Sequence, residues 1–307
     1  MADQKRADMW HPPRGAILVC VDGSAAALGA VRWAARDAVL RGAPLALVHI
    51  SDAALPEWFE IAAPPGFRQW QGQRARDFIA TAITVAEECT AASGPVQIDS
   101  QVFNSAIVPT LVGLSAEVEM LVVGHRGHGG VLAGGGLGSV SSALVYHAHC
   151  AVAVTHDDQT VNGHVARAPV LVGIDGSPAS EAATAIAFSE ASRRGVALMA
   201  LHVWTEPWVS GYWGSFQDAT WDARLSEEEE SLAERLAGWP ERYPEVPIRR
   251  IIEIGDPARC LIEASKQAQL LVVGSHGCSW FRGKLLGSVG AAAVSRAKVP
   301  VIVARQS

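Results

Sequence analysis

Two stretches of the chain, Leu121-Val122-Val123-Gly124-His125-Arg126-Gly127 and Leu271-Val272-Val273-Gly274-Ser275-His276-Gly277, read almost alike. In each, an apolar run gives way to a glycine-rich segment, and a Gly-Ser pair then precedes a helix-like stretch, at Gly138-Ser139 and at Gly287-Ser288. A glycine-rich loop that leads into a helix is the local arrangement that holds a phosphate group. One such loop is a weak signal, whereas two in corresponding positions predict a duplicated anion-binding unit.

The rest of the chain repeats in step with these loops. Ile17–Ser24 aligns with Val170–Ser177 at an offset of 153 residues, and the offset is 150 at the first loop glycine and 149 at the Gly-Ser pair. The first copy of the loop is therefore one residue longer than the second. A period this long with small slips indicates duplicated domains rather than a short-repeat solenoid. We expect a first domain over residues 1–157, a second over 168–307 and a polar linker over 158–167.

Composition narrows the class of protein. The 307 residues include 25 lysines and arginines against 31 aspartates and glutamates, a net charge of -6 that argues against a general affinity for nucleic acid. No apolar run approaches the roughly 20 residues that cross a bilayer, and the polar N-terminus lacks a signal-peptide core. We therefore predict a cytoplasmic protein without a membrane span. The sequence also contains no histidine pair or carboxylate cluster typical of a dedicated metal site.

Continuous apolar runs alternate with segments of helical period, which is typical of an α/β fold with a parallel sheet covered on both faces. Ser24 and Ser177 stand where an N-cap would begin a helix after the first strand of each half, and Glu227–Glu230 is expected on the solvated side of a later helix. The predicted strands are Ile17–Val21, Leu45–Ile50, Val96–Phe103, Met120–Val123 and Ala151–Val154 in the first half, and Val170–Ile174, Ala197–Val203, Ile248–Ile254, Leu270–Val273 and Val299–Val303 in the second.

One acidic residue and one glycine loop should meet at the same edge of each sheet. Asp22 follows the first predicted strand and Gly124 follows the fourth, and Asp175 and Gly274 repeat this arrangement. In an open parallel sheet, ligands bind beyond the carboxyl ends of the strands, where the winding of the chain reverses. Because a carboxylate repels phosphate, we expect each aspartate to face the sugar or the base of the ligand.

The loop glycines have a physical rationale. Glycine permits positive φ and a close approach of the backbone to a ligand, which we expect at Gly124, Gly127, Gly274 and Gly277. Each Gly-Ser pair would then present amides and a hydroxyl at a helix start, where the helix dipole favours phosphate oxygens. For a single copy, an alternative fits as well: the glycines only form tight turns and the aspartate caps a helix. Two copies in register favour the phosphate site.

At this point the chain resembles the universal stress protein family in its tandem two-domain form. The ATP-binding subgroup of that family carries the pattern Gly-x2-Gly-x9-Gly-Ser/Thr, which the second half matches through Gly274, Gly277, Gly287 and Ser288. The first half departs from it, with ten residues between the second glycine and the third. That departure makes ATP binding by the first domain a separate question.

The resemblance implies two tandem Rossmann-like domains of the adenine nucleotide alpha hydrolase-like type, each a five-stranded parallel sheet of order 3-2-1-4-5. It also implies ATP as the ligand, accompanied by magnesium, with aspartates at the nucleoside, two strand-end backbones at adenine, glycines and serines at the phosphates, and valines lining the site. Carried over by position, the implied residues are Asp22, Ile50, Val123, Gly124, Gly127, Gly138, Ser139 and Val140 in the first domain, and Asp175, Val203, Val273, Gly274, Gly277, Gly287, Ser288 and Val289 in the second.

Other polar residues near these positions are open to two interpretations. Six loop residues could touch terminal phosphates or a metal-bridged triphosphate, or they could form a solvated loop surface. Two histidines at equivalent strand ends are interpreted as structural, because neutral imidazole packs and hydrogen-bonds readily. The loop residues are His125, Arg126, His128, His276, Arg282 and Lys284, and the strand-end histidines are His49 and His202.

Three functions compete. The first is a regulatory stress-response protein in which ATP occupancy modulates partner interactions or the growth or dormancy state. The second is a slow ATP hydrolase or a phosphoryl- or adenylyl-transfer enzyme, although the chain lacks the G-x-x-x-x-G-K-[ST] motif and the kinase residue set. The third is an assembly scaffold with one or both sites empty. The protein partner is unknown, and the duplication suggests an internal pseudo-dimer and a homodimer formed through the terminal strands.

Overall fold

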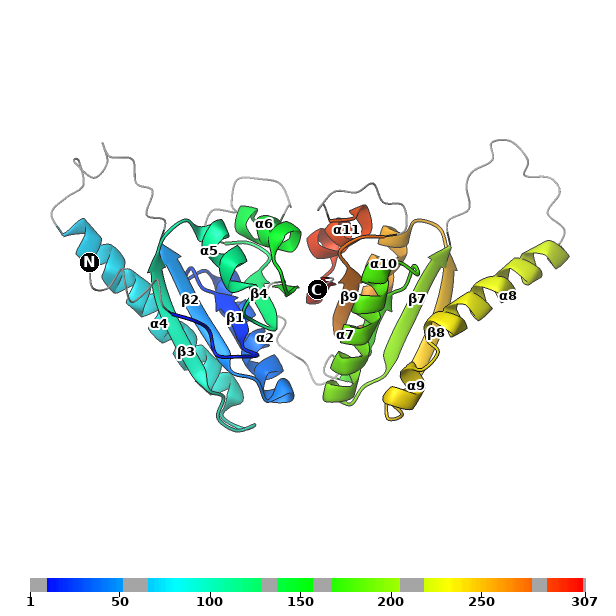
Figure 1. Cartoon of the computed structure of the whole chain (residues 1–307), viewed down its shortest axis with the longest axis horizontal. Coiled ribbons are helices and arrows are strands. Elements are labelled where there is room, and N and C mark those ends of the chain that lie inside the picture. Colours follow the sequence, from blue (N-terminus) through cyan, green and yellow to red (C-terminus); the bar gives the residue numbers. More distant parts are fainter. Residues whose placement is uncertain are drawn as a thin grey trace. The chain divides into compact units, whose positions relative to one another are not determined.

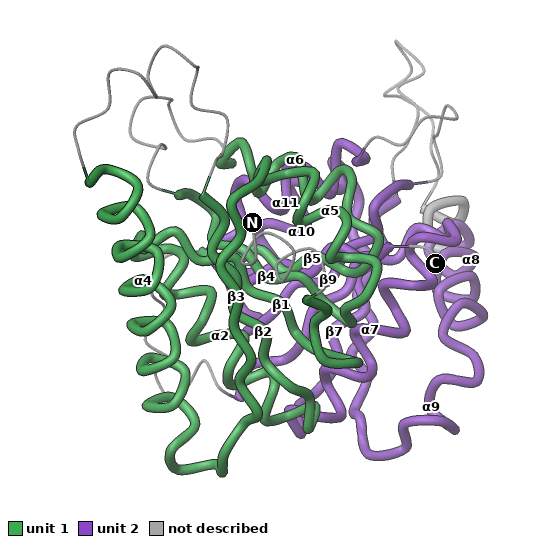
Figure 2. The backbone as a smooth tube through the Cα atoms, turned by 60° about the vertical axis from the view of Figure 1, so that its left-hand side comes forward, with its two compact units in different colours: residues 1–159, 307 green, residues 160–306 purple. Residues whose placement is uncertain are grey.

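The computed structural model describes residues 10–51, 66–127, 137–156, 167–204, 218–277 and 286–305. The chain divides into two compact units, residues 1–159 with residue 307 and residues 160–306, which Figure 2 colours separately. The division falls inside the predicted linker. Each unit has its own sheet, helices and buried core.

The first unit is built from alternating strands and helices (Figure 1). Along the chain they are β1 (Ile17–Cys20), α2 (Ala25–Arg41), β2 (Leu45–Ser51), α4 (Phe67–Thr90), β3 (Ile98–Asn104), α5 (Ile107–Leu114), β4 (Met120–Gly124), α6 (Ser139–His147) and β5 (Ala151–Thr155). The strands lie in the order β3-β2-β1-β4-β5, and every neighbouring pair is parallel. Helices α2 and α4 pack together on one face of the sheet, and α5 and α6 pack together on the other.

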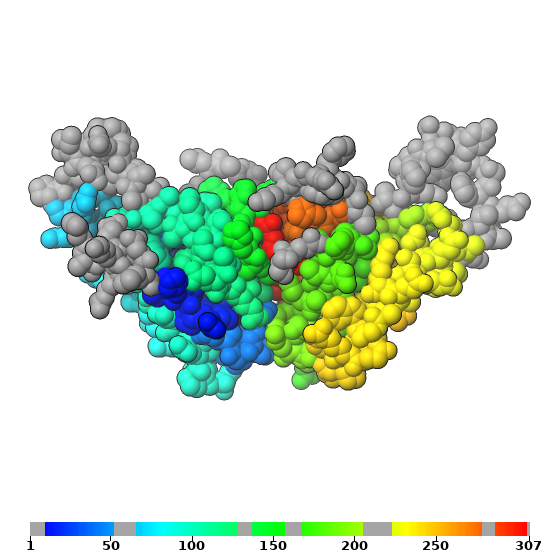
Figure 3. All heavy atoms as spheres, in the orientation of Figure 1, coloured from blue at the N-terminus to red at the C-terminus, as the bar shows by residue number. Residues whose placement is uncertain are grey.

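The second unit repeats this plan. Its elements are β6 (Val170–Gly173), α7 (Pro178–Arg194), β7 (Leu198–Trp204), α8 (Asp218–Arg235), α9 (Trp239–Arg242), β8 (Ile248–Ile254), α10 (Pro257–Ser265), β9 (Leu270–Gly274), α11 (Ser288–Arg296) and β10 (Val301–Ala304). The parallel strands lie in the order β8-β7-β6-β9-β10. Figure 3 shows the yellow atoms of α8 and α9 at the surface of this unit.

The predicted fold class is confirmed in both units, including the strand order 3-2-1-4-5. Most strand limits agree with the predictions to within a residue, and the clearest differences are late starts. Strand β10 begins at Val301 rather than Val299, because Pro300 between them has no N–H to donate to a sheet ladder. Strand β3 likewise begins at Ile98 rather than Val96.

Each first helix begins at the predicted serine and ends at a glycine. The Ser24 side chain accepts a hydrogen bond from the Ala27 amide at 3.1 Å, and Gly42 ends α2 in the left-handed region with φ of 63°. Ser177 caps α7 in the same way, and Gly195 ends it with φ of 61°. A serine N-cap and a left-handed glycine satisfy backbone groups that a helix terminus leaves without partners. These helices hold the ends of β1 and β6 in fixed positions.

Candidate functional site

A sharp Asp-Gly-Ser corner follows the first strand of each unit. In the second unit, the Ser177 amide donates to Asp175 Oδ1 at 2.9 Å, and Gly176 has φ of 79°. In the first unit, the Ser24 amide donates to Asp22 Oδ1 at 2.9 Å, with φ of 81° at the intervening glycine. Only glycine adopts such a φ without strain. The corner therefore fixes the direction of each aspartate carboxylate.

The carboxylates turn toward the glycine loops. A Cβ atom placed on Gly277 would lie 2.8 Å from Asp175 Oδ2, and one placed on Gly127 would lie 2.6 Å from Asp22 Oδ2. Real Cβ atoms essentially never approach other atoms so closely. The absence of a side chain at these two glycines thus lets the acidic residue and the loop sit side by side at the end of the sheet, in both units.

The expected reason for the loop glycines is partly wrong. Among the residues that the structure describes, the positive φ angles near the site are at the Asp-Gly-Ser corners and not at the four loop glycines. A Cβ atom on Gly124 would lie 2.7 Å from the Ala26 carbonyl oxygen, and one on Gly274 would lie 2.8 Å from the Ala179 carbonyl group. These two glycines allow the strand to pass close to the backbone of α2 or α7. The requirement is close packing between elements.

Each loop is closed by the same backbone hydrogen bond. The Gly138 amide donates to the His125 carbonyl at 2.9 Å, and the Gly287 amide donates to the Ser275 carbonyl at 2.8 Å. Residues on both sides of the two loops correspond one to one, so the additional residue of the first loop belongs to residues 128–136, which lie outside the described ranges. The first loop, although one residue longer, is therefore closed by the same backbone hydrogen bond as the second.

The helices that follow the loops begin at the site. Gly138 and Gly287 are the N-caps of α6 and α11, with φ of -60° and -63°, and neither helix has a side-chain cap within the described ranges. Ser139 and Ser288 are the first residues of these helices and are exposed. The first amides of a helix and its dipole favour an anion at that end.

A cavity of about 580 Å³ opens at this end of the second unit. It contains all eight site residues predicted for the second domain: Asp175, Val203, Val273, Gly274, Gly277, Gly287, Ser288 and Val289. Its walls come from the ends of β6 and β9, the neighbouring strands between which the winding of the chain reverses. The volume falls within the roughly 300–1,000 Å³ of small-molecule sites.

The strand-end residues assigned to adenine have a suitable backbone orientation. The Val48 carbonyl accepts from Val21 at 2.8 Å, and the Leu201 carbonyl accepts from Ile174 at 2.9 Å. Backbone groups alternate in direction along a strand, so Ile50 and Val203, two residues further on, point toward the same side. Strands β1 and β6 end before they reach the level of Ile50 and Val203, so the backbone groups of these two residues face the region beyond the ends of β1 and β6.

The first unit repeats part of this arrangement. Val123, which precedes the last residue of β4, is 4% exposed, and Ile50 near the end of β2 is 5% exposed. Val140 is half-buried in the first turn of α6. Together with Asp22, Gly127 and the loop closure, these positions correspond in the repeat to residues that line the cavity of the second unit.

Helix α8 supplies site residues that were not predicted. Glu228 and Arg235 line the cavity, as do His202 and Trp204 at the end of β7. The expectation that the whole acidic run Glu227–Glu230 is solvated is wrong for Glu228, which is half-buried, whereas its three neighbours are exposed. A signal was available, because Glu228 and Arg235 stand three and ten residues after Leu225. Positions at these spacings share one helical face.

Each strand-end histidine is held by the residue that follows the first strand of its unit. His49 Nδ1 lies 2.8 Å from the Val21 carbonyl oxygen, and His202 Nδ1 lies 2.7 Å from the Ile174 carbonyl oxygen. This contact supports the structural role predicted for them. His202 differs from its counterpart because it also lines the cavity, where its Nε2 lies 3.2 Å from Glu228 Oε2.

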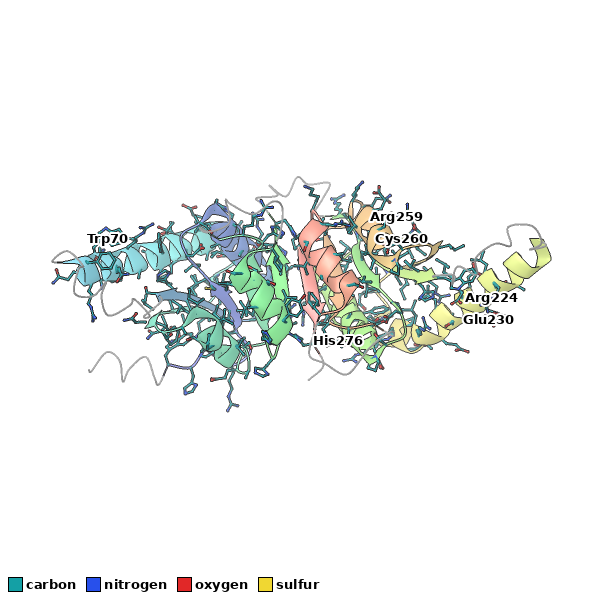
Figure 4. The ribbon with its side chains drawn as sticks, turned by 90° about the horizontal axis from the view of Figure 1, so that it is seen from above. Trp70, Arg224, Glu230, Arg259, Cys260 and His276 are labelled. Carbon is teal, nitrogen blue, oxygen red and sulfur yellow. The ribbon has the colours of Figure 1, made fainter. Side chains whose placement is uncertain are left out.

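His276 lines the same cavity and is marked in Figure 4. Its Nδ1 lies 2.9 Å from Ser275 Oγ. Burial, followed by the positive charge of Arg305, lowers the pKa of His276 below its usual value of 6.5. The imidazole is therefore neutral at neutral pH. His128, Arg282 and Lys284, which were considered with it, lie outside the described ranges.

The described ranges contain neither a metal-type cluster of side chains nor a membrane-spanning helix. No group of three or more histidine, cysteine, aspartate or glutamate side chains in these ranges is placed to hold a metal ion. Within the same ranges, no helix combines the length and the apolar character needed to cross a membrane.

Comparison with known proteins gives a consistent result. The universal stress protein family model matches residues 14–156 and again residues 167–305. Over 291 residues the chain is 50% identical to universal stress protein Rv2623 of Mycobacterium tuberculosis, covering 95% of this chain and 96% of that protein. It is 48% identical to universal stress protein Rv2005c of the same organism, covering 95% and 97%. A universal stress protein from Archaeoglobus fulgidus shares the fold, with a TM-score of 0.65, 19% identity, and coverage of 96% of this chain and all of that one. The chain belongs to the universal stress protein family and carries two of its domains in tandem.

Proposed function

We propose that the protein is an ATP-binding stress-response regulator in which nucleotide occupancy modulates its interaction with a protein partner. The observation that carries this proposal is the cavity of the second unit, where Asp175, the glycine segment after β9 and the start of α11 meet. The cavity combines backbone amides and a hydroxyl at the start of α11 with a carboxylate and apolar side chains on its walls. That combination suits a molecule that carries both phosphate groups and a nucleoside.

Different residues of the cavity would bind different parts of the nucleotide. The amides at the start of α11 and the Ser288 hydroxyl would hold phosphate oxygens, because donors and the helix dipole converge there. Asp175 would meet the nucleoside, since its charge repels phosphate. The backbone of Val203 would meet the base, with Val273 and Val289 as apolar neighbours. Magnesium would enter as the ion that the phosphates bring with them.

The first domain is proposed to bind a second nucleotide. It has the same corner at Asp22, the same approach of Gly127 and the same closure of the loop by Gly138. Its additional loop residue lies between these anchors, so it leaves the helix start in place. We therefore expect two nucleotides per chain, on domains that extend over residues 1–157 and 168–307.

The test is isothermal titration of the full chain with ATP and Mg²⁺, using glycine variants that keep the fold. Alanine at Gly124 or Gly274 is unsuitable, because its Cβ would meet helix backbone. Gly138 and Gly287 are better positions: their nearest neighbours would be 3.4 Å and 3.6 Å away, on the loop itself. Valine at either position narrows the space between the loop and the helix start, where phosphate would lie.

The parent chain should bind two equivalents of ATP, and Gly138→Val or Gly287→Val should each remove one. Gly113→Val is the control, because a Cβ atom at this glycine of α5 has no neighbour within 4 Å. A parent chain that binds no ATP would end the proposal. Release of phosphate, followed in the same samples, tests the enzyme alternative: turnover above about 1 s⁻¹, the low end for kinases, would favour it over regulation.

A further inference from the structure

The wall that α8 gives to the second cavity differs from the wall that α4 gives to the first site. We propose that Glu228, oriented by His202, determines the specificity of the second site by accepting a hydrogen bond from an uncharged donor on the nucleoside. This inference rests on the proposed function. The donor is a ribose hydroxyl or the exocyclic amine of the base, and the experiment below distinguishes the two.

His202 holds Glu228 at the cavity wall. His202 is 8% exposed, and its Nδ1 lies 2.7 Å from the Ile174 carbonyl oxygen, while its Nε2 lies 3.2 Å from Glu228 Oε2. The contact at Nε2 fixes the Glu228 carboxyl group. With Oε2 engaged, Oε1 is the acceptor that can meet a ligand.

The carboxyl groups of the cavity wall favour the uncharged end of a nucleotide. Glu228 and Asp175 line the same cavity, and Arg235 Nη1 lies 3.3 Å from His202 Nδ1. A carboxylate repels phosphate, whereas hydroxyl and amine groups donate readily to it. His276 stands among the loop residues and is uncharged at neutral pH. Glu228 is thus placed to read a donor on the nucleoside.

The first unit provides an internal comparison. His49 Nε2 lies 3.2 Å from Ser51 Oγ, a hydroxyl in place of the carboxyl group that His202 contacts. Its ring meets the edge of Phe78 of α4, with centroids 5.4 Å apart. A Cβ atom on Gly23 would overlap this Phe78 ring, whereas one on Gly176 would lie 2.8 Å from the Arg235 guanidinium. The aromatic wall of the first site is therefore replaced by a charged wall in the second.

The experiment measures nucleotide selectivity at the second site alone. The background is the full chain carrying Gly138→Val, which leaves one ATP site under the proposed function. Titrations with ATP, 2′-deoxyATP, 3′-deoxyATP and inosine triphosphate report the contribution of each hydroxyl and of the amine. Glu228→Met removes the acceptor while keeping the length of the side chain, and Glu228→Gln keeps an oxygen acceptor. Glu230→Met is the control, because Glu230 is an exposed residue of the same helix (Figure 4).

In the Gly138→Val background, one analogue should bind about ten-fold more weakly than ATP, as for the loss of a hydrogen bond to a charged group. Glu228→Met should weaken ATP binding by a similar factor and bind that analogue no worse than ATP, and Glu228→Gln should recover part of the selectivity. Loss with a deoxy analogue identifies a hydroxyl, and loss with inosine triphosphate identifies the amine. Glu230→Met should change neither ATP affinity nor selectivity.

The orienting role of His202 has its own variant. His202→Asn keeps a donor for the Ile174 carbonyl but removes Nε2, so it should reduce the selectivity between ATP and the analogue even where the fold is intact. His49→Asn, the equivalent change in the first unit, should leave selectivity at the second site unchanged. ATP binding with unaltered selectivity in Glu228→Met would overturn this inference alone, whereas a parent chain that binds no ATP would overturn both proposals.

Discussion

At the scale of single residues, the site depends on where side chains are missing as much as on where they are present. Asp175 can lie beside the loop because Gly277 has no Cβ, and Gly176 supplies the left-handed turn that aims it. The sequence predicted a role for Gly277 but indicated positive φ in the loop instead of at the corner. A glycine in the sequence does not by itself distinguish a left-handed turn from a close approach between two elements, since both exclude a side chain.

The pH dependence of stability can be predicted at His276. Its pKa is lower in the folded protein than the usual 6.5 of an unfolded chain. The unfolded chain therefore binds more protons below pH 6.5, so the stability of the second unit should fall as the pH drops below that value and should level off above it. Urea unfolding of the parent and of His276→Gln at pH 5 and pH 8 would measure this. Equal differences between the two proteins at both pH values would contradict the prediction.

At the scale of elements, the first helix of each unit contains a buried ion pair. Asp37 is 1% exposed and its Oδ2 lies 2.6 Å from Arg41 Nε within α2. Glu190 is fully buried in α7, with its Oε2 2.7 Å from Arg194 Nη2. The pairs stand at the same repeat offset of 153 residues. Each helix therefore places a charge on its buried face and neutralises it one turn later.

Removal of one partner should be costly. Glu190→Leu leaves Arg194 without its buried carboxylate and should lower the free energy of unfolding of the second unit by about 3–5 kcal/mol. Adding Arg194→Met should recover much of this loss, because apolar pairs of similar volume often replace buried ion pairs with little penalty. Urea denaturation followed by circular dichroism gives both values. A double variant no more stable than the single one would contradict this account.

The same comparison shows which parts of the fold are readable in the sequence. Strands such as β1 and β6 are buried on both faces, so continuous apolar runs identified them and the duplication supplied their partners. Buried charged residues escaped detection because composition assigns acidic side chains to the surface. Glu228 was hidden in this way among exposed glutamates, although its helical position relative to Leu225 indicated the inner face. Contacts between distant segments, such as His202 with Glu228, depend on tertiary packing that local patterns do not contain.

At the scale of the whole molecule, each unit has what a domain requires. The sheet order, the helical layers and the buried core are repeated within each half, and all residues lining the described cavity belong to residues 160–306. The predicted homodimer can be tested by light scattering, because the polypeptide has a mass of 32.4 kDa. A particle of twice that mass would support it, and monomer alone would reject it.

Separation of the halves is the corresponding prediction. Residues 1–159 and 160–307, expressed as separate chains, should each give the circular dichroism of a mixed α/β protein and a cooperative thermal transition, because each has its own core. Under the proposed function, the second half should bind ATP with the affinity of the second site in the full chain. An insoluble or unfolded half would show that its core depends on contacts outside it.

The backbone bond from Gly138 to His125, repeated between Gly287 and Ser275, has an evolutionary consequence. This hydrogen bond joins the two ends of each loop, so residues inserted between those ends leave the start of the following helix in place. After duplication, the two loops could therefore come to differ in length and sequence, while the strands and helices next to them stayed under the same constraint. A tandem protein of this kind can therefore change one loop in length without changing the fold that both halves share.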